Sequence, residues 1–166
     1  MYISEGLIWH QIATRTWADR YLLELLIVKE LINPKRILSF GCSTGEECQT
    51  LKGHFPDAEV VGCDINPDVL RTAKMRFPAF KFLFSDMQSL KNQQFDAIFA
   101  MNVFHRNTLE SETLPEYERC YFDEQIAQLR QVLAPDGALV LYASQFKDPE
   151  GFKLLGTYGK LDIYLI

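Results

Sequence analysis

The stretch RILSFGCSTGEE, residues 36–47, decides how this sequence folds. Its first five residues, RILSF, are typical of a buried strand, and residues 44–55 are typical of a helix that ends near Pro56. Between strand and helix lies GCSTG, residues 41–45, whose glycines permit a tight turn and a close approach of the backbone to a ligand. An ordinary strand-to-helix turn also explains so short a motif, so its meaning depends on the rest of the chain.

Downstream of this stretch, apolar runs alternate with helical stretches. The pattern predicts strands at residues 58–63, 80–84, 95–101 and 138–143, and helices at 66–76, 86–91 and 122–133, with a turn at 135–137. Strands joined by helices must be parallel, whereas residues 152–158 and 161–166 are separated by two residues and must be antiparallel. The predicted fold class is therefore α/β, a doubly wound Rossmann-like sheet of seven strands, mostly parallel with one antiparallel C-terminal strand.

The segment before the first strand is predicted to be largely helical. Residues 3–13 are expected to form a short helix or arm, and residues 17–32 an amphipathic helix that Asn33-Pro34 ends. Trp9 and Trp17 either pack into the core of these helices or line the opening of a site. The length of 166 residues fits a single domain, with residues 1–34 leading into an α/β core over 35–166.

Charge and cysteine content exclude several classes of partner. The net charge is −5 and no run of Lys or Arg is longer than two, which disfavours nucleic acid and anionic membranes. The four cysteines form no C-x-x-C pair, so we expect no metal site and reduced thiols, as in a cytoplasmic protein. No signal peptide or membrane span is expected, and the apolar N-terminal helix suggests a monomer or a homodimer.

Acidic residues follow the second and third predicted strands. Asp64 comes 23 residues after Gly41, close to the spacing of about 20 residues expected for an acid that binds ribose hydroxyls. Asp86 ends the third strand. Either residue alone is explained as a helix cap, but the carboxyl ends of parallel strands meet at one edge of a sheet. The sequence therefore predicts a nucleoside site at this edge.

Glu46 and Glu47 indicate which nucleoside cofactor this site prefers. They open the helix after Gly45, where a dinucleotide would place its pyrophosphate. Like charges at about 5 Å cost on the order of 1–3 kcal/mol, and a dinucleotide motif also prefers a third glycine in place of Glu46. A cationic cofactor without phosphate, S-adenosylmethionine, fits this acidic rim. The two glutamates are also explained as residues that complement the helix dipole.

The same residues resemble a known family. ILSFGCSTG (37–45), VVGCDIN (60–66), FLFSD (82–86), FDAIFAMNV (95–103) and LAPDGAL (133–139) resemble the motifs of class I S-adenosylmethionine-dependent methyltransferases. The resemblance covers about residues 35–166. It implies a class I methyltransferase fold and S-adenosyl-L-methionine as cofactor. The cofactor-binding residues that the motifs indicate are Gly41, Cys42, Ser43, Gly45, Glu46, Asp64, Ile65, Asp86, Met87 and Asn102.

Residues 41–47 look most like the first motif of the chemotaxis receptor methyltransferases, which modify glutamate side chains. In that resemblance, Thr16 and Arg20 are expected near the sulfonium. Ser39 departs from the family pattern, because many class I members carry an acid at this position. The contact that such an acid makes with the methionine end of the cofactor is either absent here or made by Glu46 instead. The chain also lacks the receptor-docking domains, so the resemblance implies the cofactor and the reaction, and leaves the methyl acceptor open.

Two residues are candidates for catalysis. His105, just after the fourth strand, is placed where a general base would stand, and Arg20 would orient an acidic substrate or the cofactor carboxylate; a loop histidine and a solvated arginine are the alternatives. Residues 106–120 form a long connection that is expected to be a substrate lid or a surface insertion.

We therefore predict a methyltransferase acting on a small molecule or a side chain. The alternative is a non-catalytic S-adenosylmethionine-binding module, and a nicotinamide-dependent oxidoreductase is disfavoured by Glu46.

Overall fold

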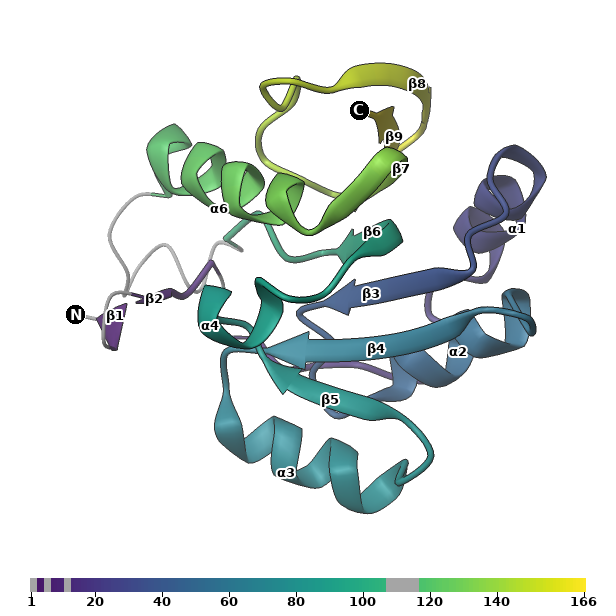
Figure 1. Ribbon diagram of the computed structural model, residues 1–166, viewed down its shortest axis with the longest axis vertical. Helices are drawn as coiled ribbons and strands as arrows, with labels where there is room; N and C mark the ends of the chain where they lie inside the picture. Colours follow the sequence, from purple (N-terminus) through teal and green to yellow (C-terminus); the bar gives the residue numbers. More distant parts are fainter. Residues whose placement is uncertain (1–2, 5–6, 11–12, 107–116) are drawn as a thin grey trace.

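The computed structural model of the protein describes residues 3–4, 7–10, 13–106 and 117–166. Its centre is a seven-stranded sheet in the order β5-β4-β3-β6-β7-β9-β8 (Figure 1). The strands are β3 (Arg36–Phe40), β4 (Glu59–Asp64), β5 (Lys81–Phe84), β6 (Phe95–Met101), β7 (Leu133–Tyr142), β8 (Lys153–Tyr158) and β9 (Leu161–Leu165). Strands β3 to β7 pair in parallel and β9 runs antiparallel to both of its neighbours. The predicted fold class is confirmed.

Helices cover both faces of this sheet, as doubly wound topology requires. The helices are α1 (Leu22–Leu31), α2 (Glu46–His54), α3 (Pro67–Arg76), α4 (Met87–Leu90) and α6 (Arg119–Gln131). Buried residues of α1, α2 and α3 form one core cluster with the sheet, and those of α4 and α6 form a second cluster on the other side. Each face therefore has its own core, and the carboxyl ends of β3, β4, β5 and β6 meet at one edge (Figure 1).

The N-terminal segment differs from its prediction. The helix expected within residues 3–13 is wrong, because β1 (Ile3–Ser4) and β2 (Leu7–Ile8) pair as a short antiparallel ladder. Gly6, which lies between these two pairs of residues in the sequence, disfavours a helix there. The next helix, predicted from residue 17, begins at Leu22, after a turn in which Asp19 has a φ of 58°.

Two other boundaries shift around the last crossover. Helix α6 begins three residues earlier than predicted, at Arg119, and β7 begins at Leu133. Residues 135–137, predicted as a turn before the strand, lie inside β7 as an irregularity at which Asp136 has a φ of 61°. Leu133 already pairs with Phe95, and the ladder resumes where Ala138 pairs with Ala97.

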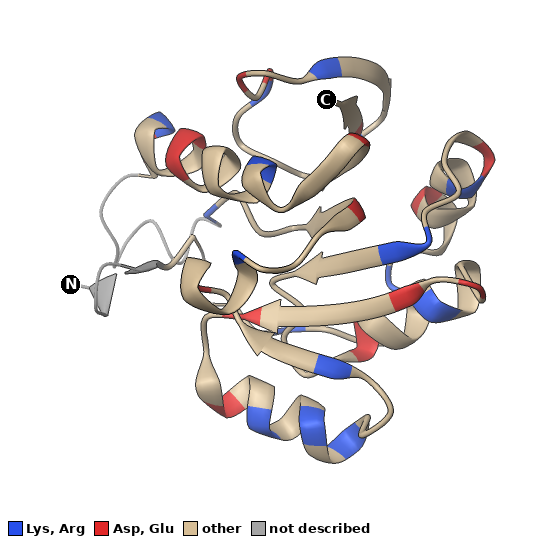
Figure 2. Ribbon diagram, viewed as in Figure 1, with Lys and Arg blue, Asp and Glu red and all other residues tan. Residues whose placement is uncertain are grey.

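Surface features follow from this arrangement. Leu22, Leu23 and Leu26 of α1 are half-exposed or more, so part of its apolar face contacts no core. Lys and Arg are spread over several elements, with a series on α3 (Figure 2).

The four cysteines, Cys42, Cys48, Cys63 and Cys120, are free thiols. In the described part of the chain, no helix combines the length and the apolarity that a membrane crossing requires.

Candidate functional site

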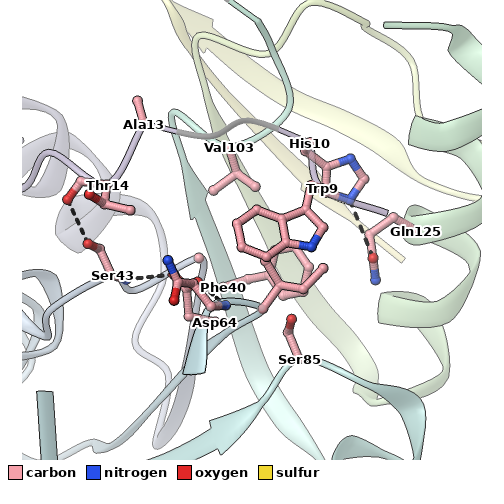
Figure 3. A pocket seen from close by; sticks show the side chains of 13 residues that line it. Trp9, His10, Ala13, Thr14, Phe40, Ser43, Asp64, Ser85, Val103 and Gln125 are labelled. Carbon is pink, nitrogen blue, oxygen red and sulfur yellow. Dashed lines mark hydrogen bonds between the residues drawn. The ribbon is translucent and has the colours of Figure 1, made fainter. Parts of the chain in front are cut away.

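A pocket with a volume of about 70 Å³ opens at the carboxyl edge of the sheet (Figure 3). The lining comes from the N-terminal segment, the ends of β3, β4 and β5, the residues after β6, and α6. Its residues are Trp9, His10, Ala13, Thr14, Phe40, Gly41, Ser43, Asp64, Ile65, Asn66, Ser85, Val103 and Gln125.

The loop after β3 is held against the end of β4. The amides of Gly41 and Cys42 both donate to the carbonyl oxygen of Cys63, at 2.9 Å each. Gly41 has a φ of 78°, and a Cβ atom there would stand 2.7 Å from a methyl group of Val103. Glycine is therefore required at this position both for its backbone conformation and for the room it leaves.

Asp64 joins this loop to the following one. Its two carboxylate oxygens accept hydrogen bonds from the amides of Ser43, at 2.8 Å, and Asn66, at 2.9 Å. Burial raises the pKa of Asp64, while the backbone bonds oppose that rise. A carboxylate offers about four lone-pair sites, so Asp64 has capacity left for hydroxyl groups in the pocket. Of the predicted cofactor residues, the structure gathers Gly41, Ser43, Asp64 and Ile65 around this pocket.

The two glutamates of α2 have different environments. Glu46 accepts a hydrogen bond from Thr44 and forms an ion pair with Arg76 of α3. Glu47 is buried and accepts a 2.7 Å hydrogen bond from the hydroxyl of Ser39. Burial raises the pKa of Glu47 to about 8, against the lowering effects of Ser39 and Arg20. The carboxyl group beside Ser39 thus belongs to Glu47.

The other predicted cofactor residues do not line this pocket. Gly45 precedes α2 with a φ of 94°, and Cys42 is buried, its thiol pKa raised by its hydrogen bond with Cys48 and by burial. Asp86 caps α4 by accepting from the Ser89 amide at 2.6 Å. Met87 packs against the core, and Asn102 follows β6 with a φ of 62°.

The candidates for catalysis are not brought into this pocket. Arg20 lies with Thr16, Trp17 and Glu47 around a separate, smaller cavity, and its guanidinium stacks on Trp17 at 4.5 Å. His105 follows β6, its amide donates to the carbonyl of Val103, and its side chain is half-buried. Most of the predicted lid, residues 107–116, lies outside the described residues.

The N-terminal segment supplies lining residues that sequence patterns missed. The buried His10 ring faces Tyr117 Oη at 2.7 Å through Nδ1 and Gln125 Oε1 at 3.4 Å through Nε2. Because the Gln125 oxygen only accepts, Nε2 carries the proton and Nδ1 accepts from Tyr117. Thr14 receives a 2.7 Å hydrogen bond from Ser43 on its carbonyl oxygen. No periodicity in residues 9–14 signals these contacts, which depend on tertiary packing alone.

Known proteins with similar sequences are methyltransferases. The chain is 29% identical over 119 residues to trans-aconitate 2-methyltransferase of Methylobacterium radiotolerans, covering 71% of this chain and 41% of that protein. It is 27% identical over 152 residues to the enzyme of the same name from Variovorax paradoxus, covering 89% and 54%. Demethylmenaquinone methyltransferase of Thermus thermophilus is 35% identical over 114 residues, covering 65% and 46%. The chain thus spans about half the length of these relatives.

Solved structures share the fold. The PH0226 protein from Pyrococcus horikoshii superposes with a TM-score of 0.63 at 17% identity, covering 89% of this chain and 88% of that one. CalS10, an amino pentose methyltransferase from Micromonospora echinaspora solved with bound S-adenosylmethionine, gives 0.57 at 24% identity, covering 87% and 60%. A family model described as a methyltransferase domain matches residues 37–137. Because this match covers more than half of the sequence, the chain belongs to the methyltransferase domain family.

Proposed function

We propose that this chain is an S-adenosylmethionine-dependent methyltransferase domain that acts on a small-molecule acceptor. The observation that carries the proposal is Asp64, a half-buried carboxylate that accepts a hydrogen bond from the Ser43 amide and lines the pocket. Asp64 would bind the ribose hydroxyls, while Gly41 and Ser43 leave room for the amino-acid end of the cofactor. The bound cofactor supplies the activated methyl group, and the chain's residues bind and orient it.

The start of α2 carries two glutamates in place of the third glycine that a dinucleotide motif prefers. The first turn of α2 carries Glu46 and Glu47, both buried, where a pyrophosphate would have to bind. Glu46 is neutralised by Arg76, whereas Glu47 is paired with the uncharged Ser39 hydroxyl. A cation placed near Glu47 would favour its ionised form and lower its raised pKa.

The remaining predictions have unequal support. The names of the relatives, which are small-molecule methyltransferases, support a small-molecule acceptor. The likeness of residues 41–47 to chemotaxis receptor methyltransferases, and the roles of Arg20 and His105, stay predictions. The partly exposed leucines of α1 are compatible with the proposed homodimer, and a monomer is the alternative.

The test compares two aspartates that are four positions apart. Asp64→Ala removes the proposed ribose ligand, and Asp68→Ala, at an exposed position at the start of α3, is the matched control. Calorimetry with S-adenosylhomocysteine should show at least a tenfold loss of affinity for Asp64→Ala and parent-like affinity for Asp68→Ala. Equal affinity of Asp64→Ala and the parent would refute the assignment.

Transfer itself needs a second experiment. A panel of small carboxylic acids, phenols and amines is incubated with the protein and methyl-labelled S-adenosylmethionine, and labelled product is measured. Product formation supports the enzyme. Tight cofactor binding without any labelled product would favour the non-catalytic module.

A further inference from the structure

Trp9 lies in the pocket although it comes from the N-terminal segment, far in sequence from the glycine loop. Figure 3 shows its indole among Val103, Phe40 and Ser85, directed toward the interior of the pocket. The residue is half-buried, so it is not a core tryptophan. Of the two alternatives for the tryptophans, Trp9 follows the one in which it lines a site, whereas Trp17 is 55% exposed and is not packed in a core.

The backbone around Trp9 is held on two sides. Arg106 donates to the Trp9 carbonyl oxygen at 3.3 Å. The next residue, His10, is fixed by its bonds to Tyr117 and Gln125, and its ring packs edge-on against Phe104 with centroids 4.8 Å apart. These contacts come from the residues after β6, from Tyr117 and from α6, so the fold holds the backbone at Trp9 beside the pocket.

The neighbours of Trp9 are those that a purine would have. Ribose hydroxyls bound at Asp64 would place the attached base within a few ångströms, toward Ile65, Ser85 and Val103, which line the same pocket. The indole is in this part of the pocket. A flat aromatic face stacks on a nucleobase, because both rings bury apolar surface and attract by dispersion.

We infer that Trp9 is a cofactor-binding residue whose indole stacks on the adenine ring of the bound cofactor. This inference rests on the proposed function. His10 acts through Trp9, as a positioning residue that holds the indole toward the pocket.

The chain's two tryptophans permit a direct test, since each single variant leaves one of them as the reporter. In Trp17→Phe, all indole emission comes from Trp9, and we expect S-adenosylhomocysteine to change it saturably. In Trp9→Phe, the emission of Trp17 should hardly respond. Adenosine should reproduce the effect in Trp17→Phe, because the inferred contact is with the base.

Affinity gives the second readout. Calorimetry should show that Trp9→Ala binds S-adenosylhomocysteine about tenfold more weakly than the parent, which corresponds to about 1.4 kcal/mol. Trp9→Phe, which keeps an aromatic face, should recover most of this loss, and Trp17→Ala is the matched control with parent-like affinity.

The outcomes separate this inference from the proposed function. If the parent binds the ligand but Trp9→Ala binds it equally or more tightly, or Trp9 emission stays constant in Trp17→Phe, the stacking role is overturned while the methyltransferase proposal stands. If the parent itself does not bind S-adenosylhomocysteine, both are overturned.

Discussion

The hydroxyl of Ser39 donates a 2.7 Å hydrogen bond to Oε1 of Glu47, joining the buried end of β3 to the first turn of α2. Both side chains are buried. A single neutral donor compensates little of the cost of removing a carboxylate from water, so burial raises the pKa of Glu47 to about 8. The pair thus holds a carboxyl group whose charge depends on what binds beside it.

Glu47→Gln tests the energetic consequence of this raised pKa. The ordinary pKa of 4.5 applies in the unfolded chain, so the unfolded state loses its proton first as pH rises. The parent should therefore lose stability between about pH 4.5 and 8, on the order of a few kcal/mol in total. Urea unfolding at several pH values should show that Glu47→Gln lacks this loss. Glu59→Gln, at an exposed position, should keep the parent's profile, and identical profiles for all three proteins would contradict the account.

Gly45→Ala and Gly53→Ala form a pair with opposite expected effects. Gly45 has a φ of 94°, and an added Cβ would stand 2.8 Å from Phe77 and 3.1 Å from Phe82. Backbone strain and overpacking should destabilise the protein by about 2–4 kcal/mol. Gly53 lies within α2, and nothing is within 4 Å of an added Cβ. Alanine there should stabilise by about 0.5–1 kcal/mol. Thermal unfolding measures both changes, and a stable Gly45→Ala would show that the loop tolerates a side chain.

The strands and glycine loop were predictable because they are local patterns. Ile37, Leu38 and Phe40 give residues 36–40 the character of a buried strand, and the glycine-containing loop 41–45 follows at once, so the turn and the parallel crossover can be inferred without tertiary information. Asp64 was predictable from its spacing, and the structure does place it beside the glycine loop. These predictions needed only that parallel strands end at the same edge.

The partner of each charged group was not predictable. Whether Glu46 or Glu47 faces Ser39 depends on helix rotation, and Arg76, which pairs with Glu46, comes from the next helix. His10 enters the site because the N-terminal segment crosses the sheet edge and contacts α6. Such contacts join residues more than 100 positions apart, and a single sequence holds no local signal for them.

His10→Phe tests the anchoring of the N-terminal segment. Burial, and to a smaller extent the positive charge of Arg106, lower the pKa of His10 to about 4, although its bond with Gln125 opposes the shift. Tyr117 faces the other ring nitrogen. As pH falls, the imidazole of His10 therefore gains its proton in the unfolded state before it does so in the folded state. The parent should lose stability as pH falls from about 6.5 to 4. The same loss in His10→Phe, measured by urea unfolding across this range, would show that His10 is not responsible.

A calorimetric titration of the parent protein with S-adenosylmethionine, repeated with NAD, tests most directly whether the pocket prefers a cationic nucleoside to a dinucleotide. The account predicts saturable binding of S-adenosylmethionine with one site per chain, and no detectable heat from NAD at the same concentrations. Binding of NAD that S-adenosylmethionine fails to displace would contradict it.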